Sequence, residues 1–162
     1  GVVTSVNIAA AIDDRLEQLG RAEQDDDLDG LMRMIVNQGR AMSARDYVHA
    51  VSNLHAIGRA VAAWMSDFDV VLTPTLAIVP PKIGVLDPMR PIAELSPVLG
   101  QMAGFLSIFN LTGQPAMSVP LATSSEGLPI GIHFAGHFGD ESALLRLAGQ
   151  LERARPWTGL AV

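Results

Sequence analysis

The sequence contains no cysteine among its 162 residues. This absence excludes a disulfide-stabilised scaffold, a thiolate zinc site and a cysteine nucleophile together. Lysine is almost as rare, because Lys82 is the only one in the chain. It lies between Pro81 and Ile83 in a proline-rich stretch, and no Gly/Ser-rich segment precedes it. We therefore assign no catalytic lysine to this chain.

Positive charge and long apolar runs are also scarce. The chain has 11 Lys and Arg residues against 17 Asp and Glu residues, which gives a net charge of −6 at pH 7. Without a basic surface to displace counterions from phosphates, nucleic-acid binding is not expected. No apolar run approaches the ~20 residues of a membrane span, and no secretory leader pattern is present at the N-terminus. We expect a cytoplasmic protein that does not bind membranes.

The composition that is present favours a well-packed core. Hydrophobic residues make up 49% of the chain and charged residues only 17%. A chain of this length can bury roughly 70% of its unfolded surface. We expect a single domain over residues 1–162, with a helical segment at 1–67 and an α/β segment at 68–162. The start at Gly1 rather than at Met indicates processing, a cloning scar or a fragment.

Apolar residues at helical spacing predict five helices. The first covers residues 6–19, with Thr4 or Ser5 as its cap and Gly20 as a left-handed stop. The others run from the acidic residues 25–27 to Gly39, from 43 to about 67, from 97 to about 109, and onward from a cap at Asp140. The third begins at a sequence that resembles a capping box, residues 43–46.

Three short stretches follow a strand pattern instead. Residues 69–73 form a β-branched run that we expect to be a buried, parallel strand. Residues 116–121 and 129–135 are joined by a polar connector that contains Gly127, which predicts an antiparallel hairpin. The proline-rich stretch 75–95 predicts a long loop. The order of these elements predicts an α/β layer structure with a small mixed sheet covered by helices.

Familiar catalytic and metal motifs are absent, which leaves weaker candidates. The acidic run 25–27 and the histidines at 49 and 55 lack metal-ligand spacing, so we expect capping and surface roles and no metal or cofactor. The residues Gly136-His137-Phe138-Gly139 are interpreted as a strand-to-helix turn. His133 and His137 are each close to Asp140 in sequence, so a Ser-His-Asp assembly is possible, but no serine lies on a strained turn beside them. Ser118 is a candidate nucleophile by itself, but the strand alternation favours a sheet role for it.

Three longer blocks carry a more specific signal. They read F-D-V-V-L-T-P-T from Phe68 to Thr75, F-N-L-T-G-Q-P-A-M-S-V-P from Phe109 to Pro120, and G-L-P-I-G-I-H-F-A-G-H-F-G-D-E from Gly127 to Glu141. Together with the ending L-L-R-L-A-G-Q-L-E-R-A-R-P-W, they resemble the C-terminal part of amidase signature family hydrolases. The upstream stretch 39–47 is also similar to that family, whereas residues 1–36 match more loosely. The resemblance covers nearly all of this chain but only about the last third of such an enzyme.

The resemblance implies an α/β/α fold and the hydrolysis of small carboxylic amides. Family members use a serine nucleophile, a second serine in a cis peptide, and a lysine whose pKa must be lowered so that it can accept a proton. The resemblance places all of these upstream of the segment matched here, so we predict no catalytic residue in this chain and no activity for it alone. Ala103 occupies the position of an acidic residue in glutamine-specific members, which disfavours glutamine as the substrate.

The same resemblance suggests residues that line the substrate pocket. The six candidates are Thr73, Pro74, Thr75, Asn110, Thr112 and Gln114. Ordinary turn chemistry is the competing explanation for each of them.

Two other functions remain open from the sequence. One is a non-catalytic α/β module that pairs with a partner chain, and the other is a stand-alone Ser/His/Asp hydrolase that depends on His133. A fragment would also expose apolar surface, through which we expect homo-oligomers to form.

Overall fold

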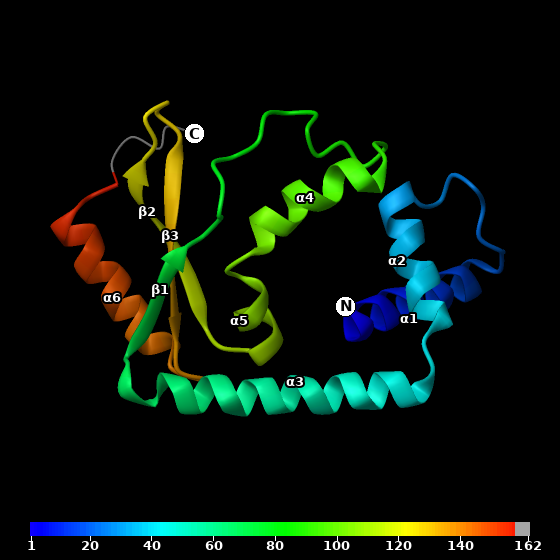
Figure 1. Ribbon diagram of the computed structural model, residues 1–162, viewed down its shortest axis with the longest axis horizontal. Helices are drawn as coiled ribbons and strands as arrows, with labels where there is room; N and C mark the ends of the chain where they lie inside the picture. The colour runs from blue at the N-terminus through cyan, green and yellow to red at the C-terminus, as the bar shows by residue number, and fades with distance from the viewer. Residues whose placement is uncertain (158–162) are drawn as a thin grey trace. The chain divides into compact units, whose positions relative to one another are not determined.

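The computed structural model describes residues 1–157, which cluster into two compact units (Figure 1). The first unit comprises Gly1–His55 with Lys82–Val98, and the second comprises Ala56–Pro81 with the chain from Leu99 onward. Helix α3 (Ala44–Trp64) and helix α4 (Ile92–Ala103) each contribute to both units. The expectation of a single domain stays a prediction.

The first unit is built around the helix pair α1 (Val2–Leu19) and α2 (Gly30–Ala41). Gly20 ends α1 in the left-handed conformation with φ 63°, as predicted. The cap prediction for Thr4 or Ser5 is wrong, because α1 already begins at Val2. Ser5 lies inside the helix, where its hydroxyl donates to the Val2 carbonyl oxygen at 3.1 Å.

The two helices approach each other closely at Gly39. A side chain at this position would collide with the Ser5 carbonyl oxygen and lie 2.8 Å from the Cβ of Ala9. Gly39 is buried inside α2, so the prediction that it ends this helix is wrong. Its small size permits the helix contact instead.

The acidic residues between α1 and α2 pair with arginines. Asp27 accepts two hydrogen bonds from Arg21, at 2.6 and 2.8 Å, and the arginine lowers the pKa of Asp27 to about 2. Asp29 caps α2 by accepting a hydrogen bond from the Met32 N–H at 2.8 Å.

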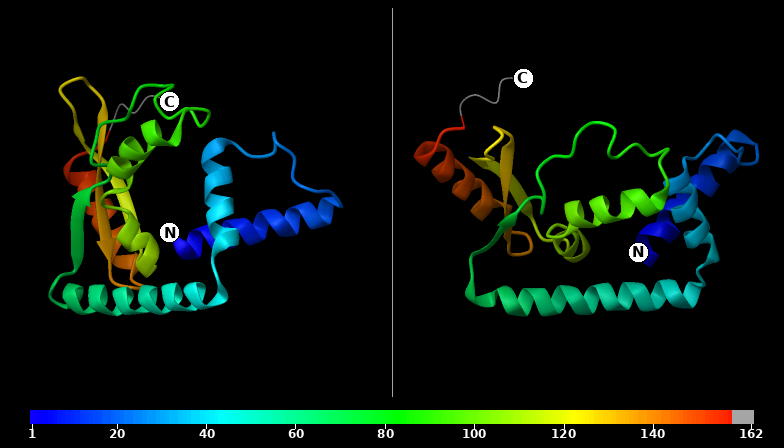
Figure 2. Two further views of the ribbon diagram at one scale, coloured as in Figure 1. Left: turned by 45° about the vertical axis from the view of Figure 1, so that its right-hand side comes forward. Right: turned by 45° about the horizontal axis from the view of Figure 1, so that its top comes forward.

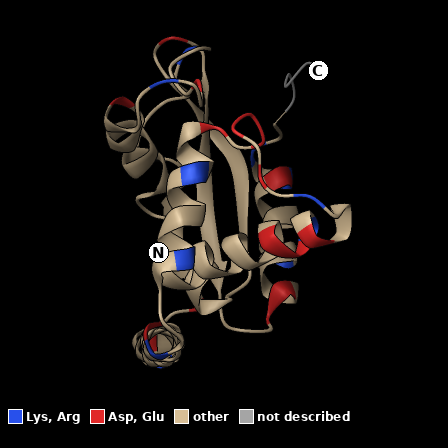
Figure 3. Cartoon of the chain, turned by 90° about the vertical axis from the view of Figure 1, so that its right-hand side faces the viewer, with Lys and Arg blue, Asp and Glu red and all other residues tan. Residues whose placement is uncertain are grey.

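No group of three or more His, Cys, Asp or Glu residues within 1–157 could hold a metal ion. Figure 3 shows the basic residues singly along the ribbon, without a continuous basic stretch.

The capping box at the start of α3 is confirmed. The Ser43 N–H donates to Asp46 Oδ2 at 3.0 Å, and the Asp46 N–H donates to Ser43 Oγ at 3.2 Å. A short 3-10 turn, η1 (Met65–Asp67), follows α3.

The helical region around Pro97 differs from the prediction. Helix α4 begins five residues earlier, at Ile92, and ends at Ala103, with Pro97 inside it. A separate short helix, α5 (Ser107–Thr112), then ends at Gly113, which has φ 72°. The expected continuous helix 97–109 is therefore two helices.

The second unit contains the sheet, whose strands are β1 (Val70–Pro74), β2 (Ala116–Thr123) and β3 (Pro129–Gly136). Their spatial order is β1-β3-β2, and β3 pairs antiparallel with both neighbours. The hairpin of β2 and β3 is confirmed. The prediction of parallel pairing for residues 69–73 is wrong. The described strands pair only antiparallel, so the prediction of a mixed sheet is wrong for them as well. Strands β1 and β2 run in the same direction, but the hairpin return places β3 between them.

One face of the sheet is covered by helix α6 (Glu141–Ala154), which is capped by Asp140 as predicted. Val119 and Phe134 from the sheet and Leu144 from α6 form the buried cluster there, and Trp157 packs against it. Because side chains alternate along a strand, the strand residues next to Val119 and Phe134 project from the opposite face of the sheet. Figures 1 and 2 show α6 along one side of the sheet and α5 on the other.

Candidate functional site

The face of the sheet that points away from α6 carries a row of polar side chains. His133 on β3 is the register partner of Thr73 on β1 and of Ser118 on β2. Two residue positions further along, beyond the pair Pro74 and Ile132, the Thr75 N–H donates to the Gly131 carbonyl oxygen at 2.9 Å. Thr73, Thr75, Ser118 and His133 therefore project from the same face.

His133 lies in the centre of this row and is 5% exposed. Its Nδ1 is 3.3 Å from the Thr73 hydroxyl oxygen, and its ring centroid is 5.2 Å from that of Phe109 on α5. Burial lowers the pKa of His133 below 6.5, because desolvation disfavours the charged imidazolium. Burial thus favours the neutral imidazole, which hydrogen-bonds to Thr73 within the sheet and packs against Phe109 of α5.

Thr75 and Ser118 meet across β3, which separates their strands. Their hydroxyl oxygens are 2.5 Å apart. A Cβ atom built on Gly131 would lie 2.6 Å from each of these oxygens. The missing side chain of Gly131 therefore leaves the space in which the two hydroxyls bond.

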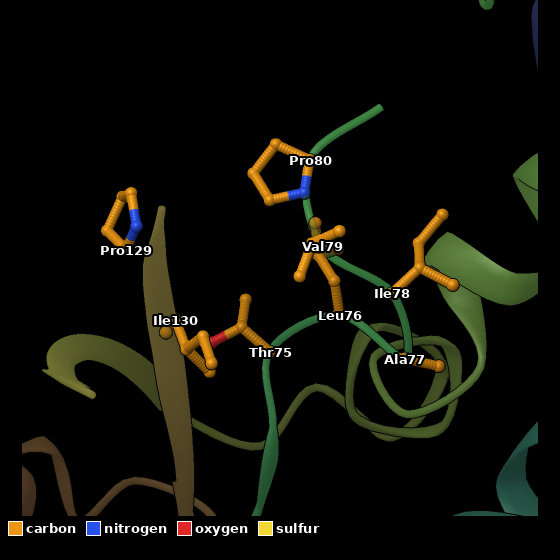
Figure 4. A pocket seen from close by; sticks show the side chains of 9 residues that line it. Thr75, Leu76, Ala77, Ile78, Val79, Pro80, Pro129 and Ile130 are labelled. Atoms are coloured by element: carbon orange, nitrogen blue, oxygen red, sulfur yellow. The ribbon is translucent and has the colours of Figure 1, made fainter. Parts of the chain in front are cut away.

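A pocket of about 260 Å³ adjoins Thr75 (Figure 4). Its walls come from the loop after β1 and from the start of β3, and they consist of Thr75, Leu76, Ala77, Ile78, Val79, Pro80, Pro129, Ile130 and Gly131. In Figure 4 the side-chain oxygen of Thr75 points toward β3. No charged side chain lines this pocket.

A second pocket, of about 240 Å³, lies over Thr73. Trp64 at the end of α3, Val71 on β1, and Phe105 and Phe109 are among the residues that line it. Thr73 is the most polar side chain in this lining. Thr73 on β1 and Thr75 just after this strand thus each border an apolar pocket.

The Ser-His-Asp arrangement does not assemble. Ser118 bonds to Thr75 rather than to a histidine, and the His133 imidazole contacts Thr73. Asp140 Oδ1 accepts hydrogen bonds from the Ala143 N–H at 3.2 Å and from the Ser142 hydroxyl at 2.9 Å. The structure therefore shows no triad among Ser118, His133 and Asp140.

The remaining histidine of that hypothesis, His137, has a structural contact. It donates from Nε2 to the Phe68 carbonyl oxygen at 2.8 Å, which links the turn after β3 to the chain before β1. This turn contains Gly139 at φ 79°, as expected for a strand-to-helix turn.

The six predicted pocket residues fall into two groups. Thr73 and Thr75 line the two pockets, and Pro74 lies between them as the exposed last residue of β1. Gln114 is near the other end of the sheet, where its Nε2 donates to the Gly136 carbonyl oxygen at 3.3 Å and contacts Met65 Sδ at 2.7 Å. Its Oε1 accepts from the Thr112 hydroxyl at 2.9 Å. Asn110 is exposed on α5.

The sequence predictions omitted Gly131, Phe109 and the apolar loop 76–80. One signal could have identified Gly131, because a glycine inside a strand pattern often marks a close approach of neighbouring groups. The loop residues carried no such signal.

Comparison with known proteins decides the family. The family model described as Amidase matches residues 3–145 of this chain. The chain belongs to the amidase family. The resemblance noted in the sequence is thus confirmed, and the chain matches the C-terminal part of its relatives.

Two curated relatives are 6-aminohexanoate-cyclic-dimer hydrolases. The protein from Paenarthrobacter ureafaciens is 33% identical over 163 residues, which cover 96% of this chain and 33% of the relative. The protein from Pseudomonas sp. (strain NK87) is 32% identical over the same coverage. This amidase-family chain therefore spans about a third of the length of these relatives.

Solved structures agree with this assignment. A 6-aminohexanoate cyclic dimer hydrolase in complex with substrate superposes with a TM-score of 0.84 at 33% identity, over 94% of this chain and 33% of that one. A structure described as an amidase superposes with a TM-score of 0.73 at 21% identity and shows the shared fold alone. The α/β class inferred from the sequence is confirmed for this amidase-family chain.

Proposed function

We propose that this chain is the C-terminal third of an amidase that converts a small carboxylic amide into the acid and ammonia or an amine. The observation that carries the proposal is the match to the Amidase family over residues 3–145. The apolar pockets beside Thr73 and Thr75 support a role in holding the substrate. The substrate complex of a family member supports a small-molecule substrate.

We further propose that the catalytic groups precede this segment in the complete protein. A serine nucleophile there attacks the amide carbonyl, the amine leaves with a proton, and water then hydrolyses the acyl ester. A cis-serine and a neutral lysine transfer the protons. Within residues 1–157, Lys82 is exposed and Ser118 is bonded to Thr75, so neither has the surroundings of such a group.

In this proposal the chain supplies scaffold and part of the pocket wall. Thr73, Pro74 and Thr75 border the acyl group of the substrate. Asn110 on α5 belongs to the wall near Phe109, whereas Thr112 and Gln114 hold the end of α5 in place. We place the complete amidase in the cytoplasm, as one domain that includes both units of this chain. No helix within the described residues has the length and apolar character needed to cross a bilayer.

The test of this proposal is the reading frame upstream of Gly1. We expect it to encode a Gly/Ser-rich segment with a lysine some tens of residues before it. Alanine substitution of that lysine should abolish amide hydrolysis by the complete protein. A frame without these elements would contradict the proposal.

The second candidate is a non-catalytic module that pairs with a partner chain. It is favoured by the exposure of Leu72 on β1 (61%) and of Trp64 (58%). This candidate predicts a separate reading frame for the chain and co-purification with a second polypeptide that covers these side chains.

A further inference from the structure

The hydroxyl pair of Thr75 and Ser118 is placed to bind a ligand as well as to hold the sheet. Ser118 is exposed and Thr75 is partly exposed, so solvent reaches the pair. It projects from the face of the sheet opposite the α6 core, at the edge of the 260 Å³ pocket.

The pair retains hydrogen-bonding capacity. Each hydroxyl has one donor and two acceptor lone pairs. Their mutual bond uses one donor and one acceptor, whichever oxygen donates. One O–H and three lone pairs therefore remain for a ligand. A neutral group that can both donate and accept, such as a carboxamide, matches this set.

The rest of the pocket restricts the ligand to uncharged, apolar chemistry. The residues 76–80, Pro129 and Ile130 contribute no charged side chain. Burial of an ammonium or carboxylate among them would lack a counterion and is costly. A closed apolar cavity of about 150 Å³ holds a benzene molecule. The larger volume here accommodates an acyl group of about six or more heavy atoms.

From these observations we propose that Thr75 and Ser118 form a neutral polar anchor that selects uncharged amides with an aliphatic or aromatic acyl group. Gly131 is a positioning residue for this anchor, because only the absence of its side chain lets the two hydroxyls meet. The inference rests on the proposed function, since it names the substrate class of the same site.

The first experiment compares substrates of equal length on the complete protein that contains this chain. Hexanamide is the neutral substrate, and 6-aminohexanamide and the monoamide of adipic acid are its charged counterparts. We expect kcat/KM for each charged amide to be at least about tenfold lower than for hexanamide. Equal rates on all three would overturn the inference.

The second experiment tests the anchor itself. Thr75→Val removes a hydroxyl without changing the shape of the side chain. It should raise the KM for hexanamide roughly threefold to tenfold with little change in kcat. Thr75→Ser restores the hydroxyl and should restore KM, which a purely structural role of the methyl group would not explain. Ser118→Ala should resemble Thr75→Val, and Ser66→Ala, at an exposed serine of η1, is the matched control.

Gly131→Ala gives an independent check. Its methyl group meets both hydroxyls, so the KM for hexanamide should rise at least as much as in Thr75→Val. A melting temperature recorded alongside separates this effect from unfolding. A folded Gly131→Ala protein with an unchanged KM would contradict the role of Gly131.

The outcomes separate this inference from the proposed function. If amides are hydrolysed but Thr75→Val leaves KM unchanged, the anchor is wrong and the amidase activity stands. If no amide is hydrolysed, the proposed function fails, and binding of hexanamide is then followed by saturation-transfer NMR. Binding weakened by Thr75→Val and restored by Thr75→Ser supports the anchor, whereas absent or unchanged binding overturns it.

Discussion

The hydroxyl oxygens of Thr75 and Ser118 lie 2.5 Å apart, although 43 residues separate them in the chain. The contact crosses Gly131 of β3, which is hydrogen-bonded to the Thr75 backbone at 2.9 Å. Strand β3 thus connects the two block motifs that contain Thr75 and Ser118. All three family blocks meet at this point of the sheet.

The first prediction concerns the helix contact at Gly39. Gly39→Ala should destabilise the protein by about 1–3 kcal/mol, because the added methyl group collides with the Ser5 backbone and with Ala9. Gly58→Ala is the matched control. Gly58 is also inside a helix but has open space around it, so this change should stabilise by about 0.5–1 kcal/mol. Denaturant unfolding of both variants measures the difference, and equal effects would refute the role of Gly39.

The second prediction concerns Gln114, whose side chain links α5 to Met65 and Gly136. Gln114→Ala should lower the free energy of unfolding by about 1–2 kcal/mol, because it leaves these polar groups without their partner. Asn110→Ala, at an exposed position of α5, should change stability by less than about 0.5 kcal/mol. If Asn110→Ala were the more damaging variant in chemical denaturation, the structural assignment of Gln114 would be wrong.

The third prediction concerns the protonation of His133. Its folded pKa is lower than the unfolded value of 6.5, so the unfolded chain binds the proton more readily. The free energy of unfolding should therefore decrease as the pH falls from 6.5 toward the folded pKa. Above pH 6.5, His133 should cause no loss of stability. NMR titration of the imidazole should give a midpoint below 6.5. His133→Gln should remove this part of the pH dependence, and a midpoint above 6.5 would contradict the burial argument.

The fourth prediction concerns the exposed apolar side chains at the β1 edge. Trp64 is 58% exposed and Leu72 is 61% exposed. The chain expressed without preceding residues should self-associate, because such surface is normally covered. Leu72→Asp should shift the sedimentation profile toward monomer. If the unsubstituted chain sediments as a single monomeric species over a tenfold range of concentration, this result would count against the interpretation that the chain is a fragment.

Local interactions made much of the fold predictable. The left-handed Gly20, the capping box at Ser43 and Asp46, and the cap at Asp140 each depend on residues within four positions of one another. Their signals are therefore complete within a short stretch of sequence. The β2–β3 hairpin was predictable for the same reason, since its connector joins strands that pair directly.

The errors in strand pairing and at Gly39 came from contacts between distant segments. The β-branched run of β1 shows that the strand is part of a sheet, but not that β3 lies between β1 and β2. Gly39 looked like a helix stop because its partner, Ser5, is far away in sequence. The Thr75 side chain was recognised as a pocket candidate, whereas its bond to Ser118 depends on register across three strands. Such relationships require the tertiary structure.

The central claim is that this chain belongs to an amidase but holds none of its catalytic groups. Release of ammonia from hexanamide, measured for the complete protein and for residues 1–162 alone, tests this most directly. We predict turnover by the complete protein and a rate equal to buffer for residues 1–162. Ammonia release by residues 1–162 above the buffer rate, whether or not Ser118→Ala abolishes it, would contradict the claim.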